Sequence, residues 1–259
     1  THYTHPSKRA RLALPEPRLQ ASMDAQITHL MMSLVDDETR PGDPTFYYRA
    51  WHRQGSYITA ALARAGDPHV SRVLSQFLAS HDFAGGSGPE ADAPGLAIWA
   101  LTESAAYIAD PVHDQWLWPH ILRKAQRIEG MVTARAPLVE PYWIPSPHDF
   151  NHGRQTRTAL LAQPARDGLI VGRVGEDWPL LYVNAVSYRG LLAAADFAER
   201  LGKRQQAARW RQHAHGLEES WQRQFPNGSP DSVTSLVSVR AWAGSATRRT
   251  QLGQPMTTY

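Results

Sequence analysis

Carboxylates, tryptophans and arginines are distributed over three short segments of the sequence, each ahead of a stretch with helical periodicity. The segments span residues 47–55, 85–92 and 168–178. Carboxyl groups can act as general acid or base, and tryptophan rings pack well against the apolar faces of sugar rings. Hydrolysis of a glycosidic bond needs two carboxyl groups flanking that bond. The segments therefore favour chemistry on a saccharide, and the side chains that stand out in them are Trp51, Arg53, Glu90, Asp92, Glu176, Asp177 and Trp178.

Glu176 and Asp177 are the predicted catalytic residues, because either could protonate a glycosidic oxygen. Adjacent carboxylates in a loop are also commonly solvated or cap a helix, and that interpretation stays open. Glu90 is predicted to face the ligand. Asp92 stands ahead of Pro94 as an N-cap residue would, so capping is the preferred role of its side chain over binding a hydroxyl group.

The aromatic and basic side chains are interpreted from the elements in which they are expected to lie. Trp51 and Arg53 either hold a sugar or buttress the helix that follows them. Trp178 and Tyr182 fall in a long predicted loop, where aromatic rings suit stacking on a ligand. Trp99 lies on an apolar helical stripe and is predicted to belong to the core.

Apolar residues recur every three or four positions in three consecutive pairs of predicted helices. Asp67-Pro68 and Asp110-Pro111 supply an N-cap and a first-turn proline, so the turns within the first two pairs are short. Short turns make each pair an antiparallel hairpin. A further helix is predicted over residues 22–35. The expected fold class is therefore all-α, and the paired helices cover residues 56–66 and 68–78, 92–107 and 111–132, and 184–201 and 203–221.

Three parts are expected along the chain: an N-terminal tail over residues 1–18, a helical-hairpin domain over 19–225, and a segment over 226–259 without a predicted element. Within the domain, residues 134–183 are rich in Pro, Gly, His, Trp and Tyr and are predicted to form one long loop. Loops of that length are usually functional.

The motifs and their order resemble the six-hairpin glycosidases, the glucoamylase-like α/α barrels. The run Trp51-His-Arg53-Gln-Gly-Ser-Tyr57 is similar to their WxRDGxY motif, and Pro89-Glu90-Ala-Asp92 through Trp99 is similar to PExDxxGxxIW. Glu176-Asp177 with Tyr188-Arg189-Gly190 resembles the carboxylate loop before their next inward helix. Gln54 stands where the first motif has aspartate, which keeps the hydrogen bonding but removes the charge, so weaker ligand binding is expected.

This resemblance implies an α/α toroid that acts on an oligosaccharide or polysaccharide, with α-linked glucosides as the expected substrates. It implies hydrolysis with inversion by carboxylate general acid/base catalysis and no cofactor. Trp51, Arg53 and Trp178 would form the subsite nearest the cleaved bond, while Glu90 and Asp92 would bind hydroxyl groups or orient water.

A ring of six hairpins needs twelve helices, and the sequence predicts about seven, so the toroid is expected to be partial and the catalytic base has no counterpart. An open edge of the ring would expose apolar helix faces and favour self-association. The alternative is a non-catalytic carbohydrate-binding or scaffold protein of the same descent, which keeps the aromatic residues without the second carboxylate.

Composition excludes several other classes. With 259 residues, 42% of them hydrophobic, the chain is expected to be globular. Its net charge of +3 is small and dispersed, which argues against a nucleic-acid partner. The absence of cysteine excludes disulfides and thiolate metal sites. His148 and His152 lie among prolines and glycine rather than on a helix, so no metal site is expected. No stretch reaches the ~20 apolar residues of a membrane span, which predicts a soluble chain and leaves its compartment open.

Overall fold

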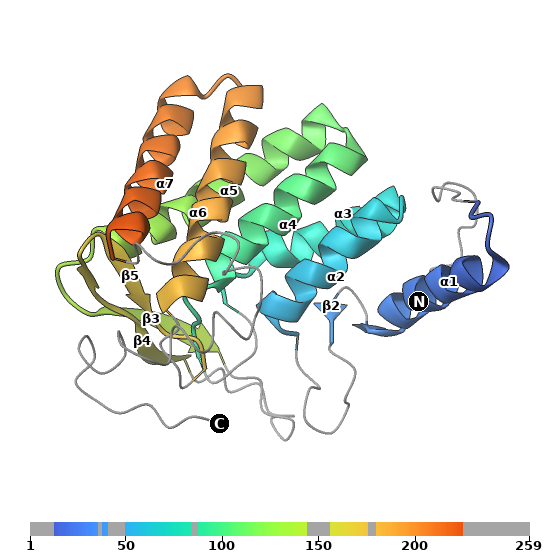
Figure 1. The fold of residues 1–259 in the computed structure, drawn as a ribbon, viewed down its shortest axis with the longest axis horizontal. Coiled ribbons are helices and arrows are strands. Elements are labelled where there is room, and N and C mark those ends of the chain that lie inside the picture. The colour runs from blue at the N-terminus through green and yellow to red at the C-terminus, as the bar shows by residue number, and fades with distance from the viewer. Residues whose placement is uncertain are drawn as a thin grey trace.

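The structure is a computed structural model, which describes residues 13–35, 38–40, 50–83, 88–143, 156–175 and 180–224. This part of the chain is mostly helical, as predicted, with two small antiparallel sheets (Figure 1). The helices are α1 (Pro17–Met32), α2 (His52–Arg64), α3 (Pro68–Ser80), α4 (Ala93–Ile108), α5 (Pro111–Val132), α6 (Leu180–Arg200) and α7 (Arg204–Gln224). The strands are β1 (Leu34–Val35), β2 (Glu38–Thr39), β3 (Leu138–Trp143), β4 (Thr156–Arg166) and β5 (Leu169–Gly172).

Helices α2 to α7 form three antiparallel hairpins arranged in two layers (Figure 1). In one layer α4 packs against both α2 and α6, and in the other α5 contacts both α3 and α7. The N-terminal ends of α2, α4 and α6 lie at the same end of the molecule, where their first residues hydrogen-bond to one another. Parts of the segments 47–55 and 85–92 and the chain after β5 therefore lie together at this end of the molecule.

Two aspartate–proline pairs begin the second helices of their hairpins, as predicted. Asp67 accepts a hydrogen bond from the Val70 N–H at 3.0 Å, and Asp110 accepts one from the Val112 N–H at 2.9 Å. Each aspartate is followed by a proline in the first turn, where the missing N–H costs no helical hydrogen bond. Gly66, with a φ of 79°, ends the turn after α2 in the left-handed region.

Helix α4 is the centre of the described fold, since it contacts α2, α3, α5 and α6. Its first half is buried on almost every side. Two glycines let α6 cross it closely: a Cβ atom on Gly190 would lie 2.7 Å from the Cα of Gly95, and one on Gly95 would lie 2.5 Å from the carbonyl oxygen of Val186. The spacing of this helix pair therefore depends on the absence of side chains at both positions.

Residues 134–183 were predicted to form one long loop, and this prediction is wrong. They contain a three-stranded antiparallel sheet in the order β3-β4-β5. Asp167 and Gly168 join β4 to β5, and both have a positive φ, 52° and 79°. A two-residue type I′ hairpin turn requires this conformation, which Asp-Gly favours. The described chain is thus a helical protein with a small sheet between α5 and α6.

The sheet is attached to the helices through a buried amide. The side chain of Asn184 on α6 accepts a hydrogen bond from the N–H of Ile170 and donates one to its carbonyl oxygen, both at 2.9 Å. An edge strand normally leaves such groups unpaired. Asn184 therefore takes the place of a neighbouring strand and fixes β5 against the start of α6.

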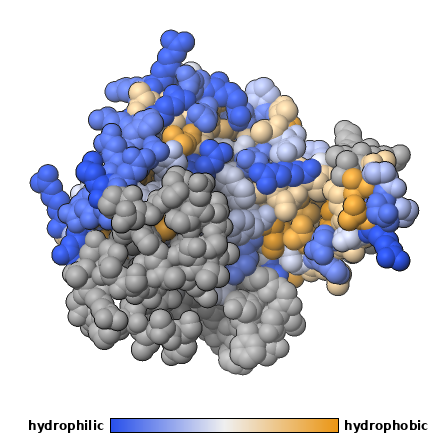
Figure 2. Space-filling view, in the orientation of Figure 1, coloured by the Kyte–Doolittle hydropathy of each residue, from blue (hydrophilic) through white to orange (hydrophobic). Residues whose placement is uncertain are grey.

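Helix α1 is the least buried of the described helices. It was expected over residues 22–35, but it ends at Met32, and the chain continues into the short β1–β2 hairpin. None of its residues is buried, and Met32 is 74% exposed. Figure 2 shows hydrophobic residues on the surface between α1 and α2, and mostly hydrophilic ones over α6 and α7. No described helix is both long and apolar enough to cross a membrane.

Candidate functional site

Five of the residues predicted to bind a ligand lie in contact with one another. Arg53 donates hydrogen bonds from Nε to Asp92 Oδ2 at 2.7 Å and from Nη2 to Glu90 Oε2 at 2.9 Å. Trp51 Nε1 donates to the same oxygen of Glu90 at 3.1 Å, and the Tyr182 hydroxyl donates to Asp92 Oδ2 at 3.1 Å. We call these five residues, Trp51, Arg53, Glu90, Asp92 and Tyr182, the Arg53 cluster.

The chain leaving β5 runs beside this cluster. Arg173 accepts a hydrogen bond from the Ala91 N–H at its carbonyl oxygen, at 2.8 Å, and the Gly175 N–H donates to Glu90 Oε1 at 2.7 Å. Both oxygens of Glu90 therefore have donors. The predicted catalytic residues Glu176 and Asp177, and the predicted binding residue Trp178, follow Gly175 in the sequence and lie outside the described residues.

The role preferred for the Asp92 side chain, capping of the following helix, is wrong. Asp92 does occupy the N-cap position of α4, but its side chain makes no capping hydrogen bond. It is 1% exposed, and its carboxylate contacts Arg53 and Tyr182 instead. A charged guanidinium is a stronger partner for a buried carboxylate than a neutral backbone N–H. Tyr182, predicted in a loop, lies in the first turn of α6.

The opposite charges of the Arg53 cluster stabilise one another. Burial lowers the pKa of Arg53, but the neighbouring Asp92 and Glu90 outweigh this effect and raise it above its ordinary value. Burial and the charge of Asp92 both raise the pKa of Tyr182. Arg53 is thus a permanent cation, and Tyr182 a hydrogen-bond donor at neutral pH. Two buried carboxylates therefore share one guanidinium.

Two other residues from the sequence motifs lie nearby but outside the cluster. Trp99, predicted in the core, is partly buried at its edge; the ring of Tyr57 meets it edge-on with centroids 5.7 Å apart. Gln54, which stands where the resembling motif has aspartate, has a buried amide oxygen without a hydrogen-bond partner among the described residues. Gln54 therefore does not replace a carboxylate in the Arg53 cluster.

His52, which lies between Trp51 and Arg53, was not among the residues predicted to have a role. It is 2% exposed, and its Nε2 lies 2.9 Å from the carbonyl oxygen of His81. A carbonyl oxygen only accepts, so Nε2 carries the proton and donates. Burial is the main reason why the pKa of His52 is lowered from 6.5 to about 3, and the charge of Lys124 adds to it. His52 is therefore neutral in the folded protein at neutral and mildly acidic pH.

This burial predicts a loss of stability in mild acid. The unfolded chain takes up a proton at His52 near pH 6.5, whereas the folded protein does so only near pH 3. The contribution of His52 to stability is thus fully present above pH 6.5 and falls by about 1.4 kcal/mol per pH unit as the pH decreases towards 3. Urea unfolding at pH 7, 6, 5 and 4.5 should show this slope. His52→Phe should reduce it, whereas replacement of the exposed His69 should not; an unchanged slope in His52→Phe would contradict the assignment.

The described residues contain no group of three or more His, Asp or Glu side chains that could hold a metal ion. His148 and His152 lie outside this part of the chain. The sequence matches no known protein-family model and no curated protein, and no solved structure matches the chain. An inference about function therefore rests on the chemistry of the Arg53 cluster.

Proposed function

We propose that this protein is glycoside hydrolase-like and acts on oligosaccharides, with α-linked glucosides as substrates. The observation that supports this proposal is the Arg53 cluster itself. The five residues come from segments far apart in the sequence, yet they hydrogen-bond to one another where α2, α4 and α6 begin. In the proposed architecture these helices are an arc of the inner ring of an α/α toroid, with α3, α5 and α7 outside it.

The cluster suits a ligand rich in hydroxyl groups. Arg53 uses Nε and Nη2 for its carboxylates and remains 24% exposed, so its other N–H groups can donate to a ligand. Holding the guanidinium on one edge limits the entropy lost when the other edge binds. Trp51 offers an aromatic surface beside it, on which an apolar sugar face can pack. Together they form the proposed subsite next to the cleaved bond.

The acid is assigned to Glu176 or Asp177 because the two carboxylates of the Arg53 cluster already accept hydrogen bonds within the protein. Glu90 accepts three hydrogen bonds and Asp92 accepts two. Their oxygens are occupied by the Arg53 guanidinium and the other donors, so neither side chain is assigned as the acid. Glu176 or Asp177 would protonate the glycosidic oxygen, and a second carboxylate on the opposite face of the sugar would activate water. No described residue is assigned as that base.

The test is the double variant Glu176→Gln with Asp177→Asn, assayed for release of reducing sugar from maltose, maltotriose and maltotetraose. Loss of the general acid should lower kcat/KM by roughly 100-fold, while calorimetric affinity stays near that of the natural protein. The matched control is Glu218→Gln with Glu219→Gln, an adjacent acidic pair on α7, which should retain activity. Unchanged hydrolysis in the first variant would refute the assignment of the acid.

The hydrogen bonds that Glu90 and Asp92 already accept also favour a second candidate, a carbohydrate-binding protein without catalysis. Such a protein needs the fixed donors and acceptors of the Arg53 cluster but no free carboxyl group. The natural protein would then bind one of the maltooligosaccharides by calorimetry and release no reducing sugar on prolonged incubation. Absence of both binding and hydrolysis across α- and β-linked glucosides would reject both candidates.

A further inference from the structure

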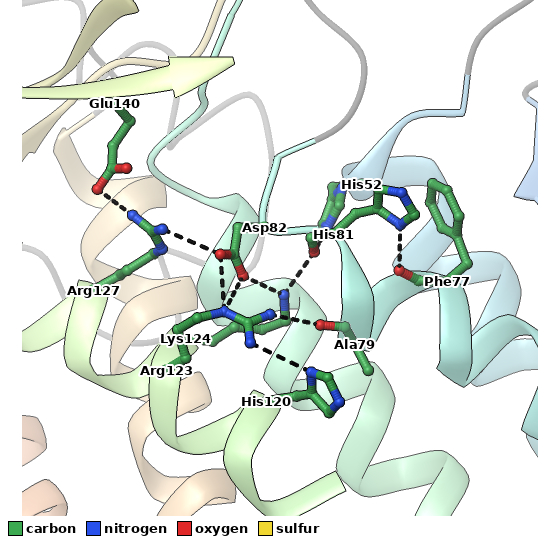
Figure 3. A network of polar contacts seen from close by, with 10 residues as sticks. All are labelled: His52, Phe77, Ala79, His81, Asp82, His120, Arg123, Lys124, Arg127 and Glu140. Carbon is green, nitrogen blue, oxygen red and sulfur yellow. Dashed lines mark hydrogen bonds and ion pairs between the residues drawn. The ribbon is translucent and has the colours of Figure 1, made fainter. Parts of the chain in front are cut away.

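A second group of charges lies at the end of α3 (Figure 3). Asp82 accepts hydrogen bonds from three cations of α5: Arg123 Nε at 2.9 Å, Lys124 Nζ at 3.0 Å and Arg127 Nη2 at 3.1 Å. Arg127 also pairs with Glu140 of β3. We call these five residues, Asp82, Arg123, Lys124, Arg127 and Glu140, the Asp82 network.

The Asp82 network caps the C-terminal end of α3. Arg123 Nη2 donates to the carbonyl oxygen of Ala79 at 2.9 Å, and Lys124 Nζ donates to that of His81 at 2.7 Å. The last carbonyl groups of a helix lack intrahelical partners, and cations are favourable there. Arg123 and Lys124 therefore satisfy carbonyl groups of α3 as well as the charge of Asp82.

Lys124 differs from the two arginines in its surroundings. Its side chain is fully buried, whereas those of Arg123 and Arg127 are 38% and 23% exposed. The arginines alone would neutralise Asp82, so balance of charge does not require a buried lysine. What Lys124 adds is its contact with the His81 carbonyl oxygen.

That oxygen joins the Asp82 network to the candidate site. It accepts from Lys124 Nζ at 2.7 Å and lies 2.9 Å from Nε2 of His52, the donor identified above. His52 lies between Trp51 and Arg53 in the sequence and begins α2. One carbonyl group thus connects the buried lysine of α5 to the helical turn that carries two members of the Arg53 cluster.

We propose that Lys124 is a positioning residue for the Arg53 cluster, acting through the His81 carbonyl group and His52 on the first turn of α2. With Lys124 present, the His81 carbonyl group is held from the α5 side and orients His52, so Trp51 and Arg53 keep their places at Glu90 and Asp92. Without the ammonium group, the carbonyl oxygen keeps only His52, and the first turn of α2 loses this restraint. The effect on ligand affinity rests on the proposed function; the effect on Trp51 does not.

The test is Lys124→Met, which keeps the length of the side chain and removes its charge. The first measurement is the indole N–H resonance of Trp51 in protein labelled with ¹⁵N-tryptophan, assigned by its loss in Trp51→Phe. This resonance reports the hydrogen bond to Glu90 and should move in Lys124→Met. The second is the maltotriose dissociation constant, which should rise roughly five- to tenfold, as expected for coupling through one contact.

The matched control is Arg123→Met, which removes a cation from the same aspartate and leaves the contact between Lys124 and His81. It should leave the Trp51 resonance in place. The proposal is overturned if Lys124→Met does not move that resonance, or if Arg123→Met moves it equally. If Lys124→Met does not fold, His52→Phe removes the other donor to the same oxygen and must move the resonance. If the resonance moves but no saccharide binds the natural protein, the positioning role holds and the proposed function fails.

Discussion

Replacement of Arg53 by methionine should lower the free energy of unfolding by about 3–5 kcal/mol. The variant leaves Glu90 and Asp92, 5% and 1% exposed, without the cation that both contact. Removing one partner of a buried ion pair leaves an uncompensated charge, and here it leaves two. Urea unfolding monitored by circular dichroism at pH 7 measures the change.

The control is an exposed ion pair between the same two helices. Arg64 of α2 pairs with Glu103 of α4 at 3.0 Å, and its side chain is 52% exposed. Arg64→Met should therefore cost less than about 1 kcal/mol. Adding Glu90→Gln and Asp92→Asn to the Arg53 variant should recover part of the lost stability. A cost for Arg53→Met no greater than that for Arg64→Met would show that the cluster is not held by its charges.

Gly190→Ala should destabilise the protein by about 3 kcal/mol, the upper end of the usual cost of overpacking. The added Cβ would lie 2.7 Å from the Cα and 2.9 Å from the carbonyl oxygen of Gly95. These are backbone atoms of a buried helix, so only a separation of α4 from α6 could relieve the clash. The change should appear as a lower urea midpoint with an unchanged dependence on urea concentration.

Gly216→Ala on α7 is the matched control, because nothing lies within 4 Å of its added Cβ. Alanine favours a helix over glycine, so this variant should be more stable by about 0.5–1 kcal/mol. The two substitutions are chemically identical and should differ in sign. Stabilisation by Gly190→Ala would mean that the helices do not approach as closely as described.

Local sequence patterns predicted the helices well where their effects are also local. Asp67 and Asp110 precede prolines, and both cap the next helix as expected. Asp92 has the same pattern, but its carboxylate is used by Arg53, 39 residues earlier in the chain. A preference between a local cap and a distant cation depends on the fold, so the sequence pattern alone could not decide it.

Two of the features that the sequence interpretation missed left different traces. The β4–β5 hairpin could have been found, since Asp167-Gly168 before an aliphatic run is a common turn sequence. Lys124 is harder to recognise: it lies on the same helical face as Leu117, Ile121 and Ile128, all of which are buried. A lysine on an apolar face usually extends its ammonium group to the solvent. Only the approach of Asp82 and the His81 carbonyl group makes burial of Lys124 favourable.

The contrast between α1 and α4 implies two levels of cooperativity in unfolding. Helix α1 buries none of its residues, so it can detach without opening the main core, by a local fluctuation of low free energy. Helix α4 contacts four other helices and cannot leave without exposing the whole interior. Because α2 and α6 pack directly on α4, the Arg53 cluster belongs to the cooperative unit that opens last. Its geometry is then preorganised before any ligand arrives, and a ligand bound there need not supply the energy to order the helices.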